Sequence, residues 1–393
     1  MGSILFQIGA LTSMNLRSLP QRIWISAAAV FAIAVVVAVL LAFLSMANGF
    51  RVTVQGSGSP ENAIVMRANS SAELNSVVSR DQANLIEEAP GIRRENGQPL
   101  VSSELYVVVD GIKRTTGTEV NIPLRGIALK GAELREGVEI IEGRMFESGR
   151  NELVVGAGVL REFAGFELGR EMTFGKTRWK VVGVFSAAGS VFDSELWADA
   201  RVVQSLFQRG SSFQTVRVRL ESPESVEELR AYVDADPRLQ LDVKTEQQYF
   251  SEQSSQTSDL ILFLGWPLGV LMALGALAGA LNTMYTSVAA RARDVATLRA
   301  IGFGGIPTFV STLAESLLLA VLGGLIGSVA AYLLFDGLSA STLGGSFTQV
   351  VFAFELSPAV ILNGTVLALI IGFIGGFFPA WRAARLPVTT AFQ

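Results

Sequence analysis

Four apolar stretches dominate this sequence, and each is long enough to cross a membrane as a helix. They cover residues 23–47, 260–290, 306–335 and 356–381. The third contains one acid, Glu315, and the other three contain no charged residue. Because about 20 residues of helix cross the apolar core of a bilayer, the sequence predicts four transmembrane helices.

The first stretch also has an alternative interpretation, as a cleaved secretory signal peptide. Arg17 and Arg22 precede it, and Ser45-Met46-Ala47 resembles a small-residue cleavage site. Its apolar core is about twice the usual length of 7–15 residues for a signal peptide. The length favours a helix that stays in the membrane.

The composition excludes most catalytic chemistry. The chain has no Cys and no His, so it lacks disulfides, thiol nucleophiles, thiolate zinc sites and imidazole bases. Its pI near 5.3 argues against nucleic-acid binding, which needs a basic surface. We therefore predict a non-catalytic chain with no metal site, no bound cofactor and no nucleic-acid partner.

The placement of basic residues predicts the orientation in the membrane. Seven of the 31 Lys and Arg residues lie outside the segment 51–255, and all seven fall on one side of four alternating spans. They are Arg17, Arg22, Arg291, Arg293, Arg299, Arg382 and Arg385. Since short basic segments stay in the cytoplasm, we expect both termini inside and the long segment outside.

The long segment between the first and second spans predicts a mixed α+β domain. Runs rich in β-branched residues at 105–109, 152–155, 179–184 and 215–219 indicate strands, and Ser79 and Ser222 are placed to begin helices. The predicted fold class is an α-helical membrane protein with four transmembrane helices plus a large α+β extracytoplasmic domain inserted between the first and second. The predicted boundaries are a cytoplasmic segment at 1–22, spans at 23–47, 258–290, 306–335 and 356–381, the outside domain at 48–257, a cytoplasmic loop at 291–305, a short outside loop at 336–355 and a cytoplasmic tail at 382–393.

The junction before the second span has two interpretations. Thr245 and Gln248 fit a capping pattern, so one helix could run from Thr245 to Ala290 and project from the membrane as a stalk. Alternatively, Gly265-Trp266-Pro267 could separate a surface helix from the span, because proline interrupts the helical hydrogen-bond ladder.

Small residues recur at close spacing in three of the spans. Such spacing lets helix backbones approach closely, either among the helices of this chain, which we favour, or at a seam between two copies. The residues are Gly275, Gly279, Gly323, Gly324, Gly327, Gly372 and Gly376.

Glu315 is the one acid inside an apolar stretch. A proton relay would need further ionisable groups at similar depth, and the other three stretches contain none. We therefore predict a structural acid that pairs with a backbone group, with a hydroxyl such as Ser316 or Thr312, or with an Arg at the inner surface.

The loop at 291–305 predicts a short amphipathic helix. Val295, Leu298 and Ile301 recur with helical spacing, and Gly302 is placed to end the helix. Such a helix could lie in the membrane interface or dock into a groove on a cytoplasmic partner. The residues alone leave both open.

This loop, with Thr-Leu-Ala-Glu-Ser at 312–316 and Gly-Gly-Leu-Ile-Gly at 323–327, resembles the MacB/LolC/FtsX-type permeases of ATP-binding cassette transporters. Residues 372–385 are similar to the family's closing span, and 14–17 to the segment before its first span. The resemblance covers the whole chain. Two departures are Asp294, where the family usually has Glu, and the residues after Pro387, where it often has an acid and Leu.

The resemblance implies a coupling helix that seats in an ATPase subunit. It also implies a MacB-like outside domain and, because no nucleotide-binding domain is recognised here, an ATPase on a separate chain that carries the ATP and Mg. The implied coupling residues are Arg293, Asp294, Val295, Thr297, Leu298, Arg299, Ile301 and Gly302.

The function that the resemblance implies is that of a mechanotransmitting permease subunit in the bacterial inner membrane. It would work with two ATPase copies and a second permease copy or paralogue, among membrane lipid and possible adaptor or lipoprotein partners, to export or extract a lipoprotein, peptide or small molecule. The alternative is an FtsX-like regulator of an extracytoplasmic enzyme such as a cell-wall hydrolase, and a third reading is a peptide sensor.

Overall fold

The computed structural model describes residues 4–18, 20, 23–344 and 348–387. They form two compact units, which we call the helical bundle (residues 1–48, 260–338 and 354–393) and the α/β domain (49–259 and 339–353). Arg22 and the tail from residue 388 onward, both used in the predictions above, lie outside the described residues.

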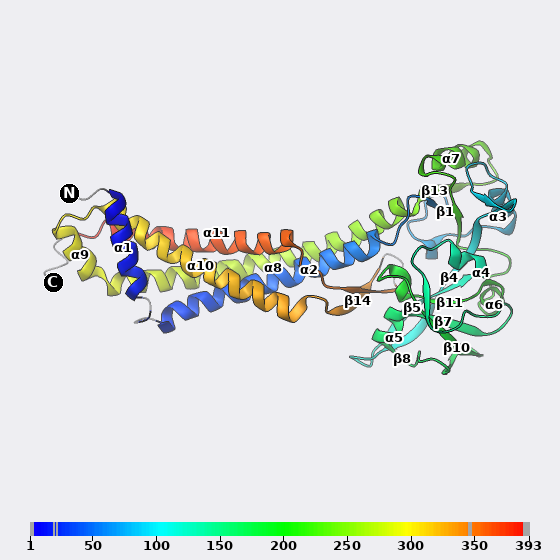
Figure 1. Ribbon diagram of the computed structural model, residues 1–393, viewed down its shortest axis with the longest axis horizontal. Coiled ribbons are helices and arrows are strands. Elements are labelled where there is room, and N and C mark those ends of the chain that lie inside the picture. The colour runs from blue at the N-terminus through cyan, green and yellow to red at the C-terminus, as the bar shows by residue number, and fades with distance from the viewer. Residues whose placement is uncertain (1–3, 19, 21–22, 345–347, 388–393) are drawn as a thin grey trace. The chain divides into compact units, whose positions relative to one another are not determined.

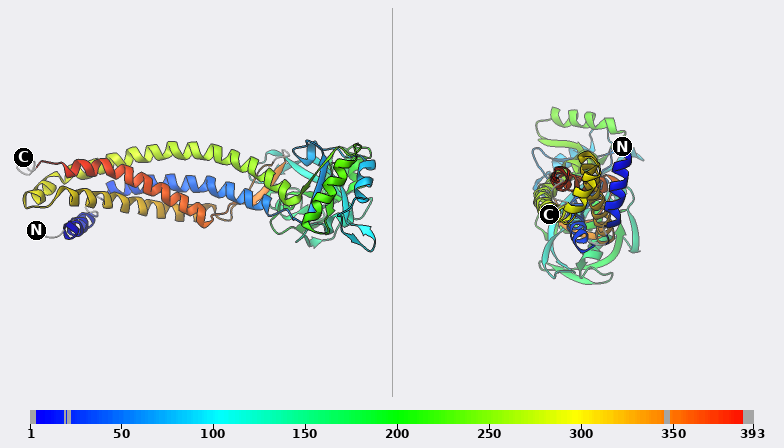
Figure 2. Two further views of the ribbon diagram at one scale, coloured as in Figure 1. Left: turned by 90° about the horizontal axis from the view of Figure 1, so that it is seen from above. Right: turned by 90° about the vertical axis from the view of Figure 1, so that its left-hand side faces the viewer.

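The helical bundle contains the four predicted spans, whose helices run side by side (Figures 1 and 2). All four are long and apolar enough to cross a membrane, so the prediction of four transmembrane helices is confirmed. The helices that lie wholly or partly in the bundle are α1 (Ile4–Ser18), α2 (Ile23–Gln55), α8 (Glu246–Ala290), α9 (Ala292–Ala300), α10 (Gly305–Phe335) and α11 (Pro358–Ala384).

Close packing around α2 holds the bundle together. Ile33, Val37 and Leu41 are fully buried. At Gly323 of α10, an added Cβ would lie 2.8 Å from the Cβ of Ile33, which is closer than real side chains approach. The helices therefore meet where one of them has no side chain.

Helix α8 is continuous over 45 residues, with Pro267 inside it. At 1.5 Å per residue it is about 68 Å long. The alternative of a separate surface helix before the second span is therefore wrong. Near the proline, an added Cβ at Gly265 would lie 2.9 Å from Phe43 of α2, so the bundle packs tightly there.

The α/β domain is built on one large sheet with helices at its faces (Figure 1). Its strands join in the order β13-β1-β12-β4-β5-β11-β7-β10-β6, with β8 on β4 and β9 on β10. Their bounds are β1 Asn62–Arg67, β4 Val101–Lys113, β5 Glu119–Ile127, β6 Glu139–Gly143, β7 Glu152–Gly156, β8 Phe163–Ala164, β9 Glu171–Phe174, β10 Thr177–Ser186, β11 Leu196–Asp199, β12 Thr215–Arg219 and β13 Leu241–Thr245. The helices are η2 Glu73–Asn75, α3 Arg80–Glu87, α4 Leu129–Glu133, α5 Ala157–Glu162, η3 Val191–Ser194, α6 Ala200–Leu206, η4 Pro223–Ser225 and α7 Val226–Ala235, and a small hairpin pairs β2 Arg94–Glu95 with β3 Gln98–Pro99.

Two apolar cores divide the domain. One draws on both ends of the domain sequence, from Ala63 to Ile92 and from Val216 to Val243. The other is built mainly from residues between them, from Leu105 to Val203. The four predicted strands lie in β4, β7, β10 and β12. Ser79, predicted to begin a helix, caps α3 and forms a capping box with Gln82.

A hairpin that the sequence analysis assigned only as a loop also belongs to the α/β domain. It pairs β14 (Ser339–Leu343) with β15 (Gln349–Ala353). The Val351 N–H donates to Ser194 Oγ at 2.8 Å, and Thr348 Oγ1 lies 3.0 Å from the Tyr106 hydroxyl. These bonds fix the hairpin on the domain.

Candidate functional site

Seven charged side chains are buried together in the α/β domain. No member exposes more than 4% of its surface, although charged groups are rarely buried in soluble domains. We call this group the ionic cluster. Its members are Glu73, Glu104, Arg125, Arg135, Glu195, Arg217 and Glu246.

Glu104 on β4 lies at the centre of the ionic cluster. Its Oε2 accepts from Arg135 Nη2 at 2.6 Å, from Arg125 Nη1 at 3.0 Å and from Arg217 Nε at 3.1 Å. The Glu104 carboxylate on β4 thus bonds to residues of β5 and β12 and to Arg135, which follows α4. Breaking one such pair leaves the remaining charges buried without compensation.

Arg217 on β12 connects the sheet to the start of α8. Its Nη2 donates to Glu73 Oε1 at 2.6 Å, and its Nη1 pairs with Glu246, the first residue of α8. On the other side, Arg125 forms a bidentate pair with Glu195 at 2.6 and 2.8 Å. The long helix therefore begins inside the ionic cluster.

Glu104 and Glu73 stay ionised although both are buried. Burial opposes the ionisation of Glu104, but three neighbouring guanidinium groups outweigh it and lower the pKa of this carboxyl from 4.5 to about 2. Burial is likewise outweighed at Glu73, whose pKa is also lowered. Phe192 and Trp197 lie 4.8 and 5.2 Å from the Arg135 guanidinium, which adds cation–π attraction.

This electrostatic arrangement predicts acid lability of the α/β domain. A lowered folded-state pKa stabilises the domain above pH 4.5, and this stability is lost as the pH falls toward 2. For Glu104 the loss is about 3 kcal/mol. Chemical denaturation of the full chain at about pH 7 and about pH 3 checks this. A Glu104→Gln variant should show a flatter pH dependence, and an equally steep one would contradict the assignment.

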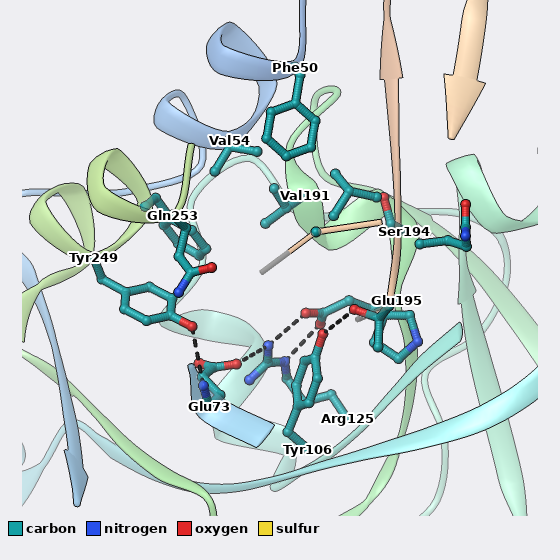
Figure 3. Close-up of a pocket in the computed structure, with 16 residues that line it drawn as sticks. Phe50, Val54, Glu73, Tyr106, Arg125, Val191, Ser194, Glu195, Tyr249 and Gln253 are labelled. Atoms are coloured by element: carbon teal, nitrogen blue, oxygen red, sulfur yellow. Dashed lines mark hydrogen bonds and ion pairs between the residues drawn. The ribbon is translucent and has the colours of Figure 1, made fainter. Parts of the chain in front are cut away.

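A small cavity of about 60 Å³ lies against the ionic cluster (Figure 3). The Tyr249 hydroxyl accepts from the Glu73 N–H at 3.3 Å, and the Tyr106 hydroxyl lies beside Thr348. Burial raises the pKa of both tyrosines, so both stay neutral. This cavity has room for only a few waters, and its polar groups are paired. It therefore presents no reactive group.

The loop helix α9 presents one face outward and one face to α1. Arg293, Asp294, Thr297 and Gly302 are exposed, and Arg299 is half-buried. Ile301 is 70% exposed. The φ of +105° at Gly302 is a glycine conformation that ends the helix, as predicted.

The predicted apolar stripe is split between these two faces. Val295 and Leu298 are half-buried and line a narrow cleft with Leu11 and Met14 of α1. Val295 and Leu298 are therefore less accessible than Ile301, and their role in coupling stays a prediction. The reason for the lower accessibility is α1, a helix that the sequence analysis did not predict and that covers this side of the loop.

Glu315 pairs with Arg291, the residue between α8 and α9. The Arg291 Nη2 lies 2.5 Å from Glu315 Oε2 and also donates to Ser287 Oγ at 2.7 Å. Of the suggested kinds of partner, an Arg and a hydroxyl are both found, because Ser287 Oγ also donates to Glu315 Oε1 at 3.3 Å. Ser316 instead donates to the Gly372 carbonyl, and Thr312 to the Thr308 carbonyl.

Replacing Glu315 with Gln is expected to destabilise the helical bundle by about 3 kcal/mol, because Arg291 keeps its charge without a counter-ion. The exposed Glu355 gives the matched control, since Glu355→Gln removes an acid from the surface. Thermal unfolding in detergent compares the two. An equal melting temperature for both variants would show that the Arg291 pair contributes nothing.

The glycines predicted to pack helices fall into two groups. At Gly323, Gly324, Gly327, Gly372 and Gly376, an added Cβ would lie 2.3 to 3.0 Å from atoms of a neighbouring helix. At Gly275 and Gly279, nothing in the described part of the chain lies within 4 Å of that position. Packing within this chain accounts for the first group, and a seam between copies stays open for the second.

Comparison with known proteins identifies two regions. Residues 26–236 match the model of the MacB-like periplasmic core domain, and residues 267–388 match the FtsX-like permease C-terminal family. The two matches together cover most of the sequence.

Among the described residues, no group of His, Cys, Asp and Glu could hold a metal ion.

Several curated relatives align with about two thirds of this chain. An uncharacterized ABC transporter permease of Methanocaldococcus jannaschii is 24% identical over 268 residues, which is 65% of each chain. The macrolide export ATP-binding/permease protein MacB of Bdellovibrio bacteriovorus is 27% identical over 290 residues, 68% of this chain and 43% of its own length. The pyoverdine export ATP-binding/permease protein PvdT of Pseudomonas entomophila is 28% identical over 267 residues, 63% of this chain and 39% of its own. The chain thus matches 39 to 65% of the length of these relatives.

Two solved structures are similar to part of the chain. The periplasmic region of MacB from Actinobacillus actinomycetemcomitans has a TM-score of 0.36 at 17% identity, covering 49% of this chain and 92% of that one. The extracellular domain of the transporter YknZ from Gram-positive bacteria has a TM-score of 0.36 at 15% identity, covering 47% of this chain and 100% of that one.

Proposed function

The chain belongs to the MacB-like and FtsX-like permeases of ATP-binding cassette transporters, and from this premise we propose that it is a mechanotransmitting permease subunit. ATP hydrolysis by an ATPase partner moves the α9 loop, and helix α8 carries this movement to the α/β domain. The domain then works on a substrate outside the membrane. ATP and Mg bind to the partner, and this chain performs no catalysis.

The observation that carries the proposal is the anchoring of α8 at both ends by buried ion pairs. Glu246 at its first residue pairs with Arg217, and Arg291, directly after its last residue, pairs with Glu315. A continuous helix resists bending, and its end charges cannot slide without leaving a buried charge unpaired. These two properties suit a rod that transmits force.

The orientation in this proposal rests on charge. The seven basic residues outside the segment 51–255 mark the cytoplasmic side. Both termini and α9 are then cytoplasmic, the MacB-like domain is periplasmic, and the membrane is the bacterial inner membrane. A second permease copy or paralogue and two ATPase copies complete the assembly.

The spans favour action outside the membrane over conduction through it. Glu315 is the one charged residue in the four apolar stretches, and it is buried and paired. Such spans offer a cargo no polar path through the membrane. The proposed work is therefore export or extraction of a lipoprotein, peptide or small molecule that is already at the outer face.

The test of transmission is a flexible Gly-Ser insertion after Gln256 in α8. We expect ATPase association and ATP hydrolysis to persist while work in the periplasm is lost, because a flexible segment does not transmit a push. Replacing Gln256 and Thr257 with two alanines is the control that keeps the helix. Full periplasmic activity after the insertion would contradict a rigid α8.

Affinity purification from the native membrane with mass spectrometry tests the partners. We expect an ATPase of the ATP-binding cassette class at equal stoichiometry. A periplasmic adaptor beside it supports export, whereas a cell-wall hydrolase or its activator supports the regulatory alternative. Absence of any ATPase in mild detergent would contradict the proposed function.

A further inference from the structure

A pocket of about 360 Å³ lies between the start of α10 and the end of α11, which run side by side in the bundle (Figures 1 and 2). Pockets that bind small molecules are typically 300 to 1,000 Å³. At Gly305, an added Cβ would lie 2.9 Å from the Ala384 carbonyl oxygen, so the two helix ends meet closely here. The lining is formed by Gly305, Ile306, Phe309, Trp381, Ala384 and Arg385.

The side chains of this pocket can be reached from outside the bundle. Ile306 is 66% exposed, Trp381 is 48% exposed, and Arg385 is exposed as well. A molecule in the pocket can therefore contact an apolar side chain, an aromatic ring and a guanidinium group directly.

A stripe of side chains on α11, which we call the aromatic stripe, leads from the pocket into the span. Its members recur every fourth residue, which places them on one face of the helix. They are Phe373, Phe377, Trp381 and Arg385. The ring centroids of Phe373 and Phe377 lie 5.9 Å apart, and those of Phe377 and Trp381 lie 6.2 Å apart. The Arg385 guanidinium lies 4.4 Å from the centroid of the Trp381 ring.

The length of the aromatic stripe matches one leaflet of a membrane. Its first and last members are 12 residues apart, which is about 18 Å of helix. One leaflet contributes about 15 Å to the apolar core of a bilayer. The three aromatic rings would therefore lie at the depth of the acyl chains, and the guanidinium group at the depth of the phosphates.

The charges at this end of the bundle favour an anionic ligand. Asp294 is the one acid in the three segments predicted to be cytoplasmic. It lines the cleft against α1, and no acid among the described residues lines this pocket. Arg299 brings a second guanidinium group close, because its Nη1 donates to the carbonyl of Leu386, the residue after Arg385. The positive amine of a zwitterionic headgroup would find no counter-charge in the pocket.

We propose that this pocket binds an anionic phospholipid, with the lipid phosphate at Arg385 and an acyl chain along the aromatic stripe. The stripe is apolar within the span and charged at its end, which is the order of groups along a phospholipid. Basic pockets between membrane helices are suited to anionic headgroups. A soluble anion would contact Arg385 but would leave the apolar part of the stripe uncovered. The orientation proposed above assigns the lipid to the inner leaflet, and binding itself does not depend on the ATPase assignment.

The test is native mass spectrometry of the full chain released from detergent micelles, which identifies each bound lipid by its mass. The probes are palmitoyl-oleoyl phosphatidylglycerol, palmitoyl-oleoyl phosphatidylcholine and inorganic phosphate. We expect saturable binding of phosphatidylglycerol, with an affinity about fivefold or more above that of phosphatidylcholine, because a basic residue at a membrane surface favours anionic lipid by about this factor.

Two pairs of variants locate the site. Arg385→Gln should lower the affinity for phosphatidylglycerol about fivefold. Its matched control is Arg382→Gln, which removes the same charge from an exposed arginine that lies 5.8 Å from the Tyr285 ring, outside this pocket. Ile306→Glu places a negative charge on the exposed wall and should lower the affinity by a similar factor, whereas Ile306→Gln adds no charge and should have the smaller effect.

The outcomes separate the possibilities. Preferential binding of phosphatidylglycerol with these variant effects supports the proposal. Equal losses in Arg385→Gln and Arg382→Gln would overturn it, since they indicate diffuse attraction to a basic surface. Equal affinity for the two lipids, or no saturable lipid binding, would overturn it as well. Binding of inorganic phosphate without phosphatidylglycerol would assign the pocket to a soluble anion instead.

Folding and the proposed function are controlled separately. Equal melting temperatures of the variants and the unsubstituted protein confirm that folding is intact. The experiment contains no ATPase, so failure to bind lipid would leave the proposed function standing, and failure of that function would leave the lipid site standing.

Discussion

Replacing Arg217 with Met is expected to destabilise the α/β domain by about 3–5 kcal/mol, the range for breaking a buried ion pair. Glu73 and Glu246 would each lose a guanidinium partner while staying buried, and Glu104 would lose one of three. Because whole domains are stable by only about 5–15 kcal/mol, this one change should leave a large unfolded population.

The absence of cysteine in the chain allows a direct measurement. A single cysteine at Ala198, which is fully buried on β11, becomes reactive to a thiol reagent only when the domain opens. Labelling rates with and without Arg217→Met then report the change in stability. The matched control is Arg219→Met on the same strand, since its partners Glu61 and Glu136 are largely exposed and such pairs contribute at most about 1 kcal/mol.

A second change should restore part of the lost stability. In Arg217→Met combined with Glu246→Leu, one unpaired carboxylate is removed, so the double variant should label more slowly than Arg217→Met alone. Equal labelling of the Ala198→Cys protein with and without Arg217→Met would show that the ionic cluster does not hold the domain together.

Replacing Ile301 with Asp is expected to prevent association with the ATPase partner, with affinity lowered about 30-fold or more, as for a central interface residue. Ile301 is the exposed apolar residue at the end of α9, and a charge there could not enter an apolar groove. Co-purification of the ATPase with each variant measures the effect.

Ile301 is chosen because the predicted apolar stripe of Val295, Leu298 and Ile301 is divided between two faces of α9. Leu298 faces the cleft with α1, so a charge at Leu298 would disturb the bundle and the partner together. Ile301→Leu preserves an apolar side chain and serves as the control. Undiminished co-purification of the ATPase with Ile301→Asp would rule out α9 as the docking element.

The sequence predicted those parts of the fold that depend on local pattern. Apolar length defined the four spans, and the Ser79–Gln82 pair defined the start of α3. Glu315 could be assigned a structural role because an acid at that depth needs a partner, although a backbone group, a hydroxyl and an Arg were all left open as that partner. For the spans and for the start of α3, the physical cause lies within the pattern itself.

The missed elements depend on contacts between distant residues. Helix α1 is too short to span a membrane, and it is held by contacts such as Asn15 Nδ2 to Ser311 Oγ at 3.3 Å. The ionic cluster joins residues from Glu73 to Glu246. Its one local sign was a charge within an apolar strand, as at Arg217 between Val216 and Val218, and such a residue is more often solvent-facing.

The span of sequence that the ionic cluster covers has a consequence for biogenesis. During synthesis the N-terminal residues emerge first, so Glu73 and Arg125 are present long before Glu246. Strand β1 also waits for β13, its partner on one side. The apolar stretch at 260 follows Glu246 by only 14 residues. The domain therefore completes its sheet and its charge balance only as the second span reaches the membrane. Until then the edge of β1 that pairs with β13 is unpaired, and it is exposed to chaperones and proteases outside the membrane.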